Sequence, residues 1–137
     1  MRYWLILFML VCSPAWSAQF LYKDVCLNGQ HEGGGNCDYT TLEAAVNGNE
    51  QDLTGDGWFD IDIKGAWASA DTTAVTVHNY TTTADDYINI YTTGSARHQG
   101  VWSTTAYRLI VSLDYFSVIN AGGVLCFYLD GVQLQSS

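Results

Sequence analysis

The sequence predicts an all-β fold, either a β-solenoid of stacked coils or an antiparallel β-sandwich. Short runs in which apolar and polar residues alternate recur along the chain, as expected for strands with one solvated face. Stretches rich in Gly, Ser, Thr and Asp separate these runs and are typical of turns. The 137 residues suffice for one domain with a core.

Residues 1–17 are predicted to be a secretory signal peptide and are excluded from the fold. Arg2 gives a positive start, Leu5–Val11 an apolar segment, and Ala15–Ser17 a small-x-small site with cleavage after Ser17, or alternatively after Ala18. The apolar segment is roughly half of the about 20 residues that a membrane-spanning helix needs. We therefore expect a secreted, extracellular protein without a membrane span.

Residues 18–38 form an N-terminal segment with a predicted disulfide between Cys26 and Cys37. Export permits disulfides, and the glycines at 33–35 make the intervening loop flexible enough to bring the two sulfurs together. Cys126 is then left over, and we interpret it as a buried free thiol.

A short helix is predicted between Thr40 and Gly48. Thr40 is the expected N-cap, Glu43 completes a capping box, and Gly48 supplies a left-handed stop. A helix of two turns is marginal alone, so it must pack on an apolar surface, such as the first coil of a solenoid that needs a cap.

From Trp58 onward the hydrophobic period is two. The expected strands are Phe59–Lys64, Ala74–Val77, Tyr87–Ile90, Tyr107–Leu113, Phe116–Ile119, Leu125–Leu129 and Val132–Leu134. Their irregular spacing is compatible with a parallel β-helix and with a sandwich, although the lack of Asn-Gly and Asp-Gly turns between the strongest strands counts against the sandwich.

Several short motifs occur in an order found in one protein group. They are Asp38–Leu42, Asp52–Gly55, Asp71–Thr73, Thr81–Ile88, Arg97–Gly100 and Tyr107–Leu109. Over residues 38–134 the chain resembles the N-terminal part of secreted or phage-type right-handed parallel β-helix proteins with pectate-lyase-like architecture, which are mostly uncharacterised. The resemblance implies that residues 39–137 are a β-helix-like domain of opening coils, truncated at the C-terminus. The open last coil would invite self-association.

The formal net charge of −9 argues against a nucleic-acid partner, because such binding rests on Lys and Arg that neutralise phosphates. No catalytic motif is present, and the three histidines are far apart in sequence. We assign no catalytic residues and expect that the chain is not an enzyme.

Asp52, Asp56 and Asp60 alternate with other residues around a glycine, which resembles a calcium-binding loop. The twelfth position, where a bidentate Glu belongs, is Ile63, and a predicted strand follows instead of a helix. Two interpretations remain: a polar turn that leads into a strand, and a weak calcium site formed by the three aspartates.

Aromatic residues are numerous, and exposed rings on a sheet can bind sugars. The candidate ligand-binding residues are Tyr91, Trp67 and Trp102, with Tyr91 on the face opposite Ile88 and Ile90; core packing is the alternative role for these rings. We expect a non-catalytic extracellular β-helix module with a surface, adhesion or glycan-contact role. The alternative is the N-terminal fragment of a polysaccharide-degrading β-helix enzyme.

Overall fold

The strands of the computed structural model pair in parallel. The structure describes residues 20–29, 34–55, 57–112 and 118–136. The largest sheet has the order β1-β2-β4-β7, formed by β1 (Leu21–Cys26), β2 (Phe59–Lys64), β4 (Ile88–Thr92) and β7 (Phe127–Asp130). Two smaller sheets pair β3 (Val75–Thr76) with β6 (Ile119–Asn120), and β5 (Arg108–Val111) with β8 (Gln133–Ser136).

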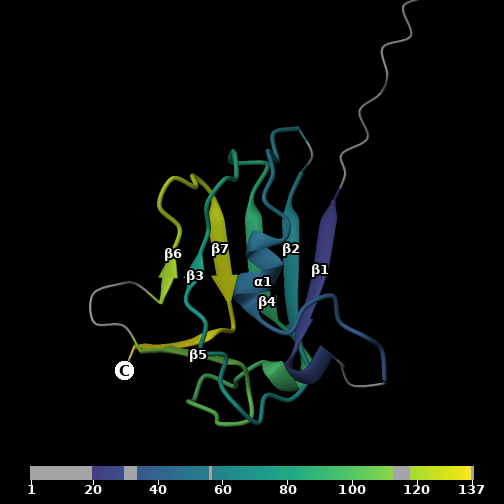
Figure 1. Ribbon diagram of the computed structural model, residues 1–137, viewed down its shortest axis with the longest axis vertical. Helices are drawn as coiled ribbons and strands as arrows, with labels where there is room; N and C mark the ends of the chain where they lie inside the picture. The colour runs from purple at the N-terminus through teal and green to yellow at the C-terminus, as the bar shows by residue number, and fades with distance from the viewer. Residues whose placement is uncertain (1–19, 30–33, 56, 113–117, 137) are drawn as a thin grey trace, which may run out of the picture.

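The chain returns to the large sheet after each excursion and joins it in register. Leu21 pairs with Phe59, Phe59 with Ile88, and Ile88 with Phe127. The chain passes through α1 (Leu42–Asn47) between β1 and β2, through β3 between β2 and β4, and through β5 and β6 between β4 and β7. In the view of Figure 1 the smaller sheets lie beside and below the large one. Parallel strands cannot be joined by tight hairpins, so each return needs a long connection. The prediction of an all-β fold is confirmed, and the strand pairs among the described residues are all parallel, unlike those of an antiparallel sandwich.

The predicted alternation gives the large sheet one core face and one outer face. Ile61 and Ile63 of β2 and Ile90 of β4 are fully buried, whereas Asp60 and Asn89 on the opposite side are only partly covered. Inward-pointing aliphatic side chains from successive strands therefore stack into one continuous core.

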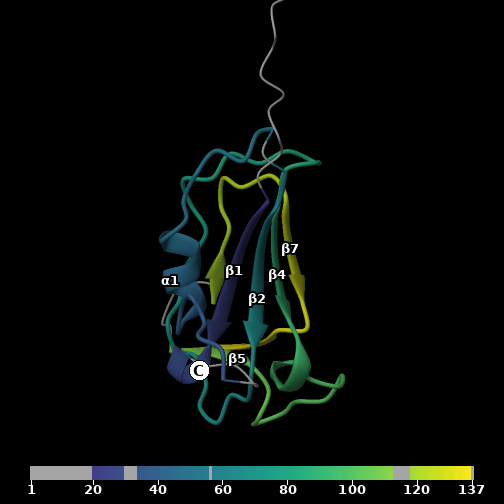
Figure 2. The same ribbon diagram turned by 90° about the vertical axis from the view of Figure 1, so that its right-hand side faces the viewer.

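Helix α1 (Leu42–Asn47) covers the core on the side away from the outer face (Figure 2). Its N-cap is Thr41, which accepts a hydrogen bond from the Ala44 amide at 3.2 Å, so the prediction of Thr40 was one residue early. The left-handed stop was also wrong, because Gly48 is right-handed with φ −76°. Glycine is needed there for space: a Cβ would lie 2.8 Å from the Tyr39 hydroxyl.

Strand β1 was not predicted from the sequence. The edge of β1 that does not pair with β2 is covered by a short segment around Tyr39. Val25 pairs with Tyr39, whose amide donates to Asp24 O at 3.0 Å and whose carbonyl accepts from the Cys26 amide at 3.0 Å. The predicted disulfide between Cys26 and Cys37 is confirmed and ties this segment to β1. At the other end of the sheet, β7 pairs only with β4 among the described strands.

The remaining described elements are two short 3₁₀ turns, η1 (Leu27–Gly29) and η2 (Gly94–Ala96). The predicted signal peptide, residues 1–17, and the first half of the predicted strand Phe116–Ile119 lie outside the described residues, and Ile119 belongs to β6. Within the described ranges, no helix is long and apolar enough to cross a membrane.

Candidate functional site

The outer face of the large sheet gathers aromatic and carboxylate side chains. We call the row formed by Phe20, Trp58, Tyr87 and Tyr128 the ring ladder. Phe20 and Trp58 precede the paired residues Leu21 and Phe59, and Tyr87 precedes Ile88, so three of the rings lie at equivalent positions on neighbouring strands. In-register parallel pairing therefore aligns side chains that are far apart in the sequence.

The rings of the ladder contact one another across the strands. Ring centroids are 4.4 Å apart for Phe20 and Trp58, 5.9 Å for Trp58 and Tyr87, and 4.9 Å for Tyr87 and Tyr128. Phe20 is 58%, Trp58 36% and Tyr128 53% exposed. The ladder is thus a solvent-accessible aromatic strip and not part of the core.

A carboxylate is held beside the ladder by neutral donors. Asp60 Oδ2 accepts a hydrogen bond from Trp58 Nε1 at 3.1 Å, and Asp60 Oδ1 accepts one from Asn89 Nδ2 at 2.9 Å. The two contacts fix the carboxylate and the indole relative to each other.

A hollow of about 370 Å³ opens on this face between β4 and β7. It is lined by Tyr87, Asn89, Tyr128, Leu129 and Asp130. Asp130 forms a bidentate ion pair with Arg97, in which guanidinium nitrogens lie 2.8 and 2.9 Å from the carboxylate oxygens. The Arg97 hydrogen bond, and then its charge, hold the pKa of Asp130 below the usual value.

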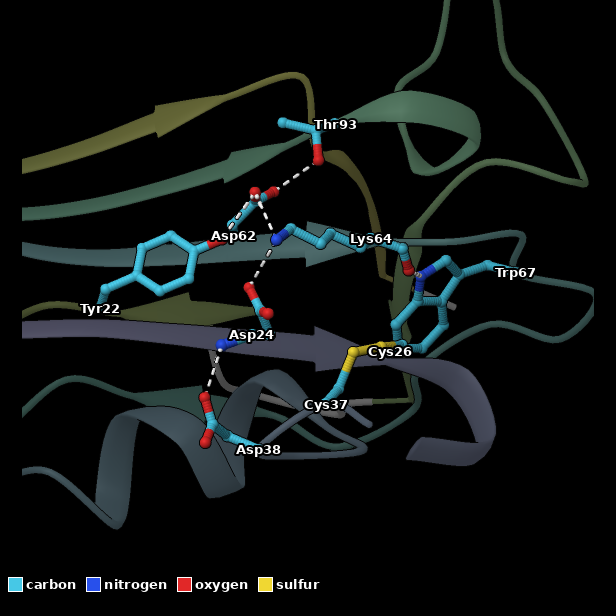
Figure 3. Close-up of a disulfide and its surroundings, with 9 residues drawn as sticks. All are labelled: Tyr22, Asp24, Cys26, Cys37, Asp38, Asp62, Lys64, Trp67 and Thr93. Carbon is cyan, nitrogen blue, oxygen red and sulfur yellow. Dashed lines mark hydrogen bonds and ion pairs between the residues drawn. A yellow bond between two sulfur atoms is a disulfide. The ribbon is translucent and has the colours of Figure 1, made fainter. Parts of the chain in front are cut away.

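A second cluster lies on the same face, nearer to the C-terminal ends of β1 and β2, and surrounds Lys64 (Figure 3). Lys64 Nζ is 2.9 Å from Asp24 Oδ1 and 3.4 Å from Asp62 Oδ2. Asp62 also accepts hydrogen bonds from the hydroxyls of Tyr22, at 3.1 Å, and Thr93, at 2.7 Å. The cluster explains why Asp62 is 5% exposed although it points away from the core.

The Lys64 cluster stabilises the charged lysine and the neutral phenol. Partial burial by itself would lower the pKa of Lys64, but its contacts with Tyr22, Asp24 and Asp62 raise that pKa above the usual value. Burial, followed by the neighbouring carboxylates, raises the pKa of Tyr22. Neither group is therefore prepared to lose a proton near neutral pH.

The three rings predicted to bind ligand lie in different environments. Trp67 is 1% exposed and packs edge-on against Tyr107 at 4.7 Å between centroids, so it belongs to the core and is not accessible to a ligand. Trp102 is 48% exposed in the loop that follows η2, where it lines a separate hollow of about 610 Å³. Tyr91 lies on the outer face as expected, but half-buried beside Asp62, and burial raises its pKa.

Two aspartates of the predicted calcium site, Asp52 and Asp60, lie in the part of the chain that the structure describes. Asp52 Oδ1 accepts from the Thr54 amide at 2.9 Å, which forms a turn, whereas Asp60 is held at the ladder. Asp56 lies outside the described residues. Among the described residues, no three His, Cys, Asp or Glu side chains are placed to hold a metal ion.

Sequence reasoning missed the ring ladder and the role of Asp86. Asp86 accepts hydrogen bonds from the Gly55 amide at 3.2 Å and the Gly57 amide at 3.0 Å, and so organises the turn before β2. An aromatic residue directly before a strand, as in Trp58-Phe59 and Tyr87-Ile88, is the signal that could have suggested the ladder. Aligning these positions requires the register between strands.

The comparisons with known proteins find no relative of this chain. Neither a protein-family model, nor a curated protein, nor a solved structure matches the chain.

Proposed function

We propose that this chain is a non-catalytic extracellular module that contacts glycans through the ring ladder on the outer face of its large sheet. The observation that carries the proposal is the ladder itself. The exposed parts of Phe20, Trp58 and Tyr128 lie on neighbouring strands and offer successive apolar contacts to sugar rings, while the planes of adjacent rings differ by 39°, 16° and 75°. Contacts repeated on neighbouring strands suit a polymer.

We further propose that the fold is a right-handed parallel β-helix and that residues 59–136 are its successive coils. The support is the return of β2, β4 and β7 to one sheet in parallel register, with β3 and β6, and then β5 and β8, paired on other sides. A stack of coils exposes a long ladder on one side, as a module that lies along a polymer requires. Export, as the leader predicts, would place the ladder outside the cell.

Binding to neutral oligosaccharides tests the glycan-contact proposal. Xylan, mannan, β-glucan and N-acetylglucosamine hexamers are titrated against the folded protein by calorimetry. For the oligosaccharide that binds, we expect Trp58→Ala and Tyr128→Ala to weaken binding by roughly 2 kcal/mol, about 30-fold, because an anchoring ring is lost. Trp102→Ala is the matched control, since it removes an exposed ring outside the ladder.

Two results would count against the proposal. If none of these oligosaccharides binds at millimolar concentration, the ladder has no glycan-binding role. If Trp102→Ala abolishes binding while the ladder variants bind normally, the binding site lies in the loop hollow, as the sequence-based prediction for Trp102 would have it.

The second candidate is the front portion of a polysaccharide-degrading β-helix enzyme, favoured by one observation. Asp24, Asp62 and Lys64 place two carboxylates and a cation together on the outer face. The three groups are occupied with one another, and the raised pKa of Lys64 opposes its use as a base. Incubation with acidic and neutral polysaccharides decides the matter, because product release that disappears in Lys64→Met would favour the enzyme.

Self-association through the last coil stays a prediction. Three leucines near β7 and β8 are exposed: Leu125 by 84%, Leu129 by 37% and Leu134 by 42%. Sedimentation of the mature protein over a range of concentrations tests it, with Leu125→Ser as the variant expected to stay monomeric. A monomer at all concentrations would refute the prediction.

A further inference from the structure

We propose that the glycan recognised by the ring ladder carries protonated amines, and that Asp60 is the residue that selects them. This inference rests on the proposed glycan-contact function and specifies its ligand class. The chemistry meant is a polymer of amino sugars with free ammonium groups, rather than a neutral or a uronic-acid polymer.

Carboxylates outnumber cations on the outer face. Among the described residues of this face, the carboxylates are Asp24, Asp60, Asp62 and Asp130, and the cations are Lys64 and Arg97. Both cations are already paired, Lys64 with two carboxylates and Arg97 with one. A polyuronate would therefore meet carboxylates without a cation free to bind it, and like charges would oppose its approach.

The carboxylate of Asp60 is not paired with a cation in the part of the chain that the structure describes. Among the described residues, Asp60 has no cationic partner, because its two hydrogen bonds come from an indole and from an amide. Each carboxylate oxygen accepts one of these bonds and keeps capacity for another, since an ionised carboxylate has about four acceptor positions. Asp60 can thus accept from an ammonium without giving up its present partners.

The Asp60 carboxylate lies next to the Trp58 ring. Trp58 both belongs to the ladder and donates to Asp60 at 3.1 Å, and Asn89, the other donor, lines the hollow beside Tyr87. A sugar ring that packs against the solvent-exposed part of Trp58 would bring an amine toward the Asp60 carboxylate, because the indole N–H donates to that carboxylate. Asp60 is only partly covered, so the ammonium can reach it from solvent.

The test compares two hexasaccharides that differ only in whether the amine is acetylated, and adds an acidic hexasaccharide, at a pH at which the free amine is protonated. Glucosamine hexamer, N-acetylglucosamine hexamer and galacturonic acid hexamer are titrated against the folded protein, together with hexalysine as a charged ligand without sugar rings. We expect the glucosamine hexamer to bind about tenfold more tightly than its acetylated form, because a charge-assisted hydrogen bond is gained. We expect the galacturonic acid hexamer not to bind.

Two variants assign the selectivity to Asp60. Asp60→Asn keeps the shape of the side chain but removes its charge, and it should remove the tenfold preference, so that the two hexamers bind with equal affinity. Asp85→Asn is the matched control, because it removes the same charge from an exposed residue that is not part of the ladder, and it should preserve the preference.

The outcomes separate this inference from the function on which it rests. Equal affinity for the two hexamers, or a preference that survives in Asp60→Asn, overturns the amine inference but leaves glycan binding intact. Hexalysine binding as tightly as the glucosamine hexamer also overturns it, because charge alone would then suffice. If no hexasaccharide binds, the glycan-contact function itself fails.

Discussion

Replacing Cys26 and Cys37 together by alanine would remove the cross-link that holds the segment ending at Tyr39 against the edge of β1. The two cysteines are 11 residues apart in the sequence, and their Cα atoms are 5.9 Å apart. Cys26 is fully buried, so alanine is preferred over serine, whose hydroxyl would be buried there without a designed partner.

The expected loss follows from the length of the closed loop. For a loop of about 12 residues, the chain-entropy relation gives the unfolded state about 9.5 cal/mol/K more entropy without the bond, or about 2.8 kcal/mol at 25 °C. The small cavity left by the buried Cys26 sulfur adds to this loss. We therefore expect the free energy of unfolding to fall by about 3 to 4 kcal/mol.

Urea unfolding followed by tryptophan fluorescence measures this change. With a slope of roughly 1 to 3 kcal/mol/M, the midpoint should fall by about 1 to 4 M. Cys26→Ala alone should lower the free energy of unfolding nearly as much as the double variant, since either change removes the disulfide. Cys126→Ala, at the free and partly exposed thiol, should change the free energy of unfolding little. A loss below about 1 kcal/mol in the double variant would refute the argument, and if that variant does not fold, reduction of the native protein with dithiothreitol gives the same comparison.

Three further changes test the packing and the electrostatics. Gly48→Ala should destabilise the protein by roughly 1 to 3 kcal/mol in urea, because the new Cβ would lie 2.8 Å from the Tyr39 hydroxyl; a gain in stability would contradict that close approach. Ile61→Ala should cost roughly 2 to 5 kcal/mol in the same assay, and a cost below 1 kcal/mol would mean that β2 does not face the core as described. Burial, followed by the charge of Asp71, raises the pKa of Tyr107 well above its usual value, so the folded state keeps this phenol neutral while the unfolded state ionises it. The corresponding stability is fully present below about pH 10 and is lost as the pH rises further. Tyr107→Phe should make the melting temperature fall less steeply between pH 9 and 11, and identical slopes would exclude Tyr107 as the cause.

The parts of the fold that are local in the sequence were predictable. The alternation in Phe59–Lys64 assigned each side chain of β2 to a face, and the glycines between Cys26 and Cys37 indicated the disulfide. Strand β1 escaped because Lys23 occupies a position that pairs with the buried Ile61. The structure tolerates it at the edge of the sheet, where the Lys23 ammonium lies 3.7 Å from Asp38.

The candidate site was harder to predict because it depends on register. Phe20, Trp58 and Tyr87 become neighbours only when three distant strands pair, and no local pattern fixes which residues will face each other. The same limit applies to single aromatic residues. Nothing local to Trp67 and Trp102 distinguishes the buried ring from the exposed one.

Among the described residues, β1 is covered at its edge by the Tyr39 segment whereas β7 pairs only with β4, and this difference gives the large sheet a direction in its local stability. A sheet whose strands contact only their neighbours opens from its edges, and each further strand opens only after the one outside it. At the β1 end, opening must also release Tyr39 and its disulfide tether. Amide hydrogens of β7 should therefore exchange with solvent before those of β4, and those of β2 last, so that fraying begins beside the hollow lined by Tyr128 and Asp130.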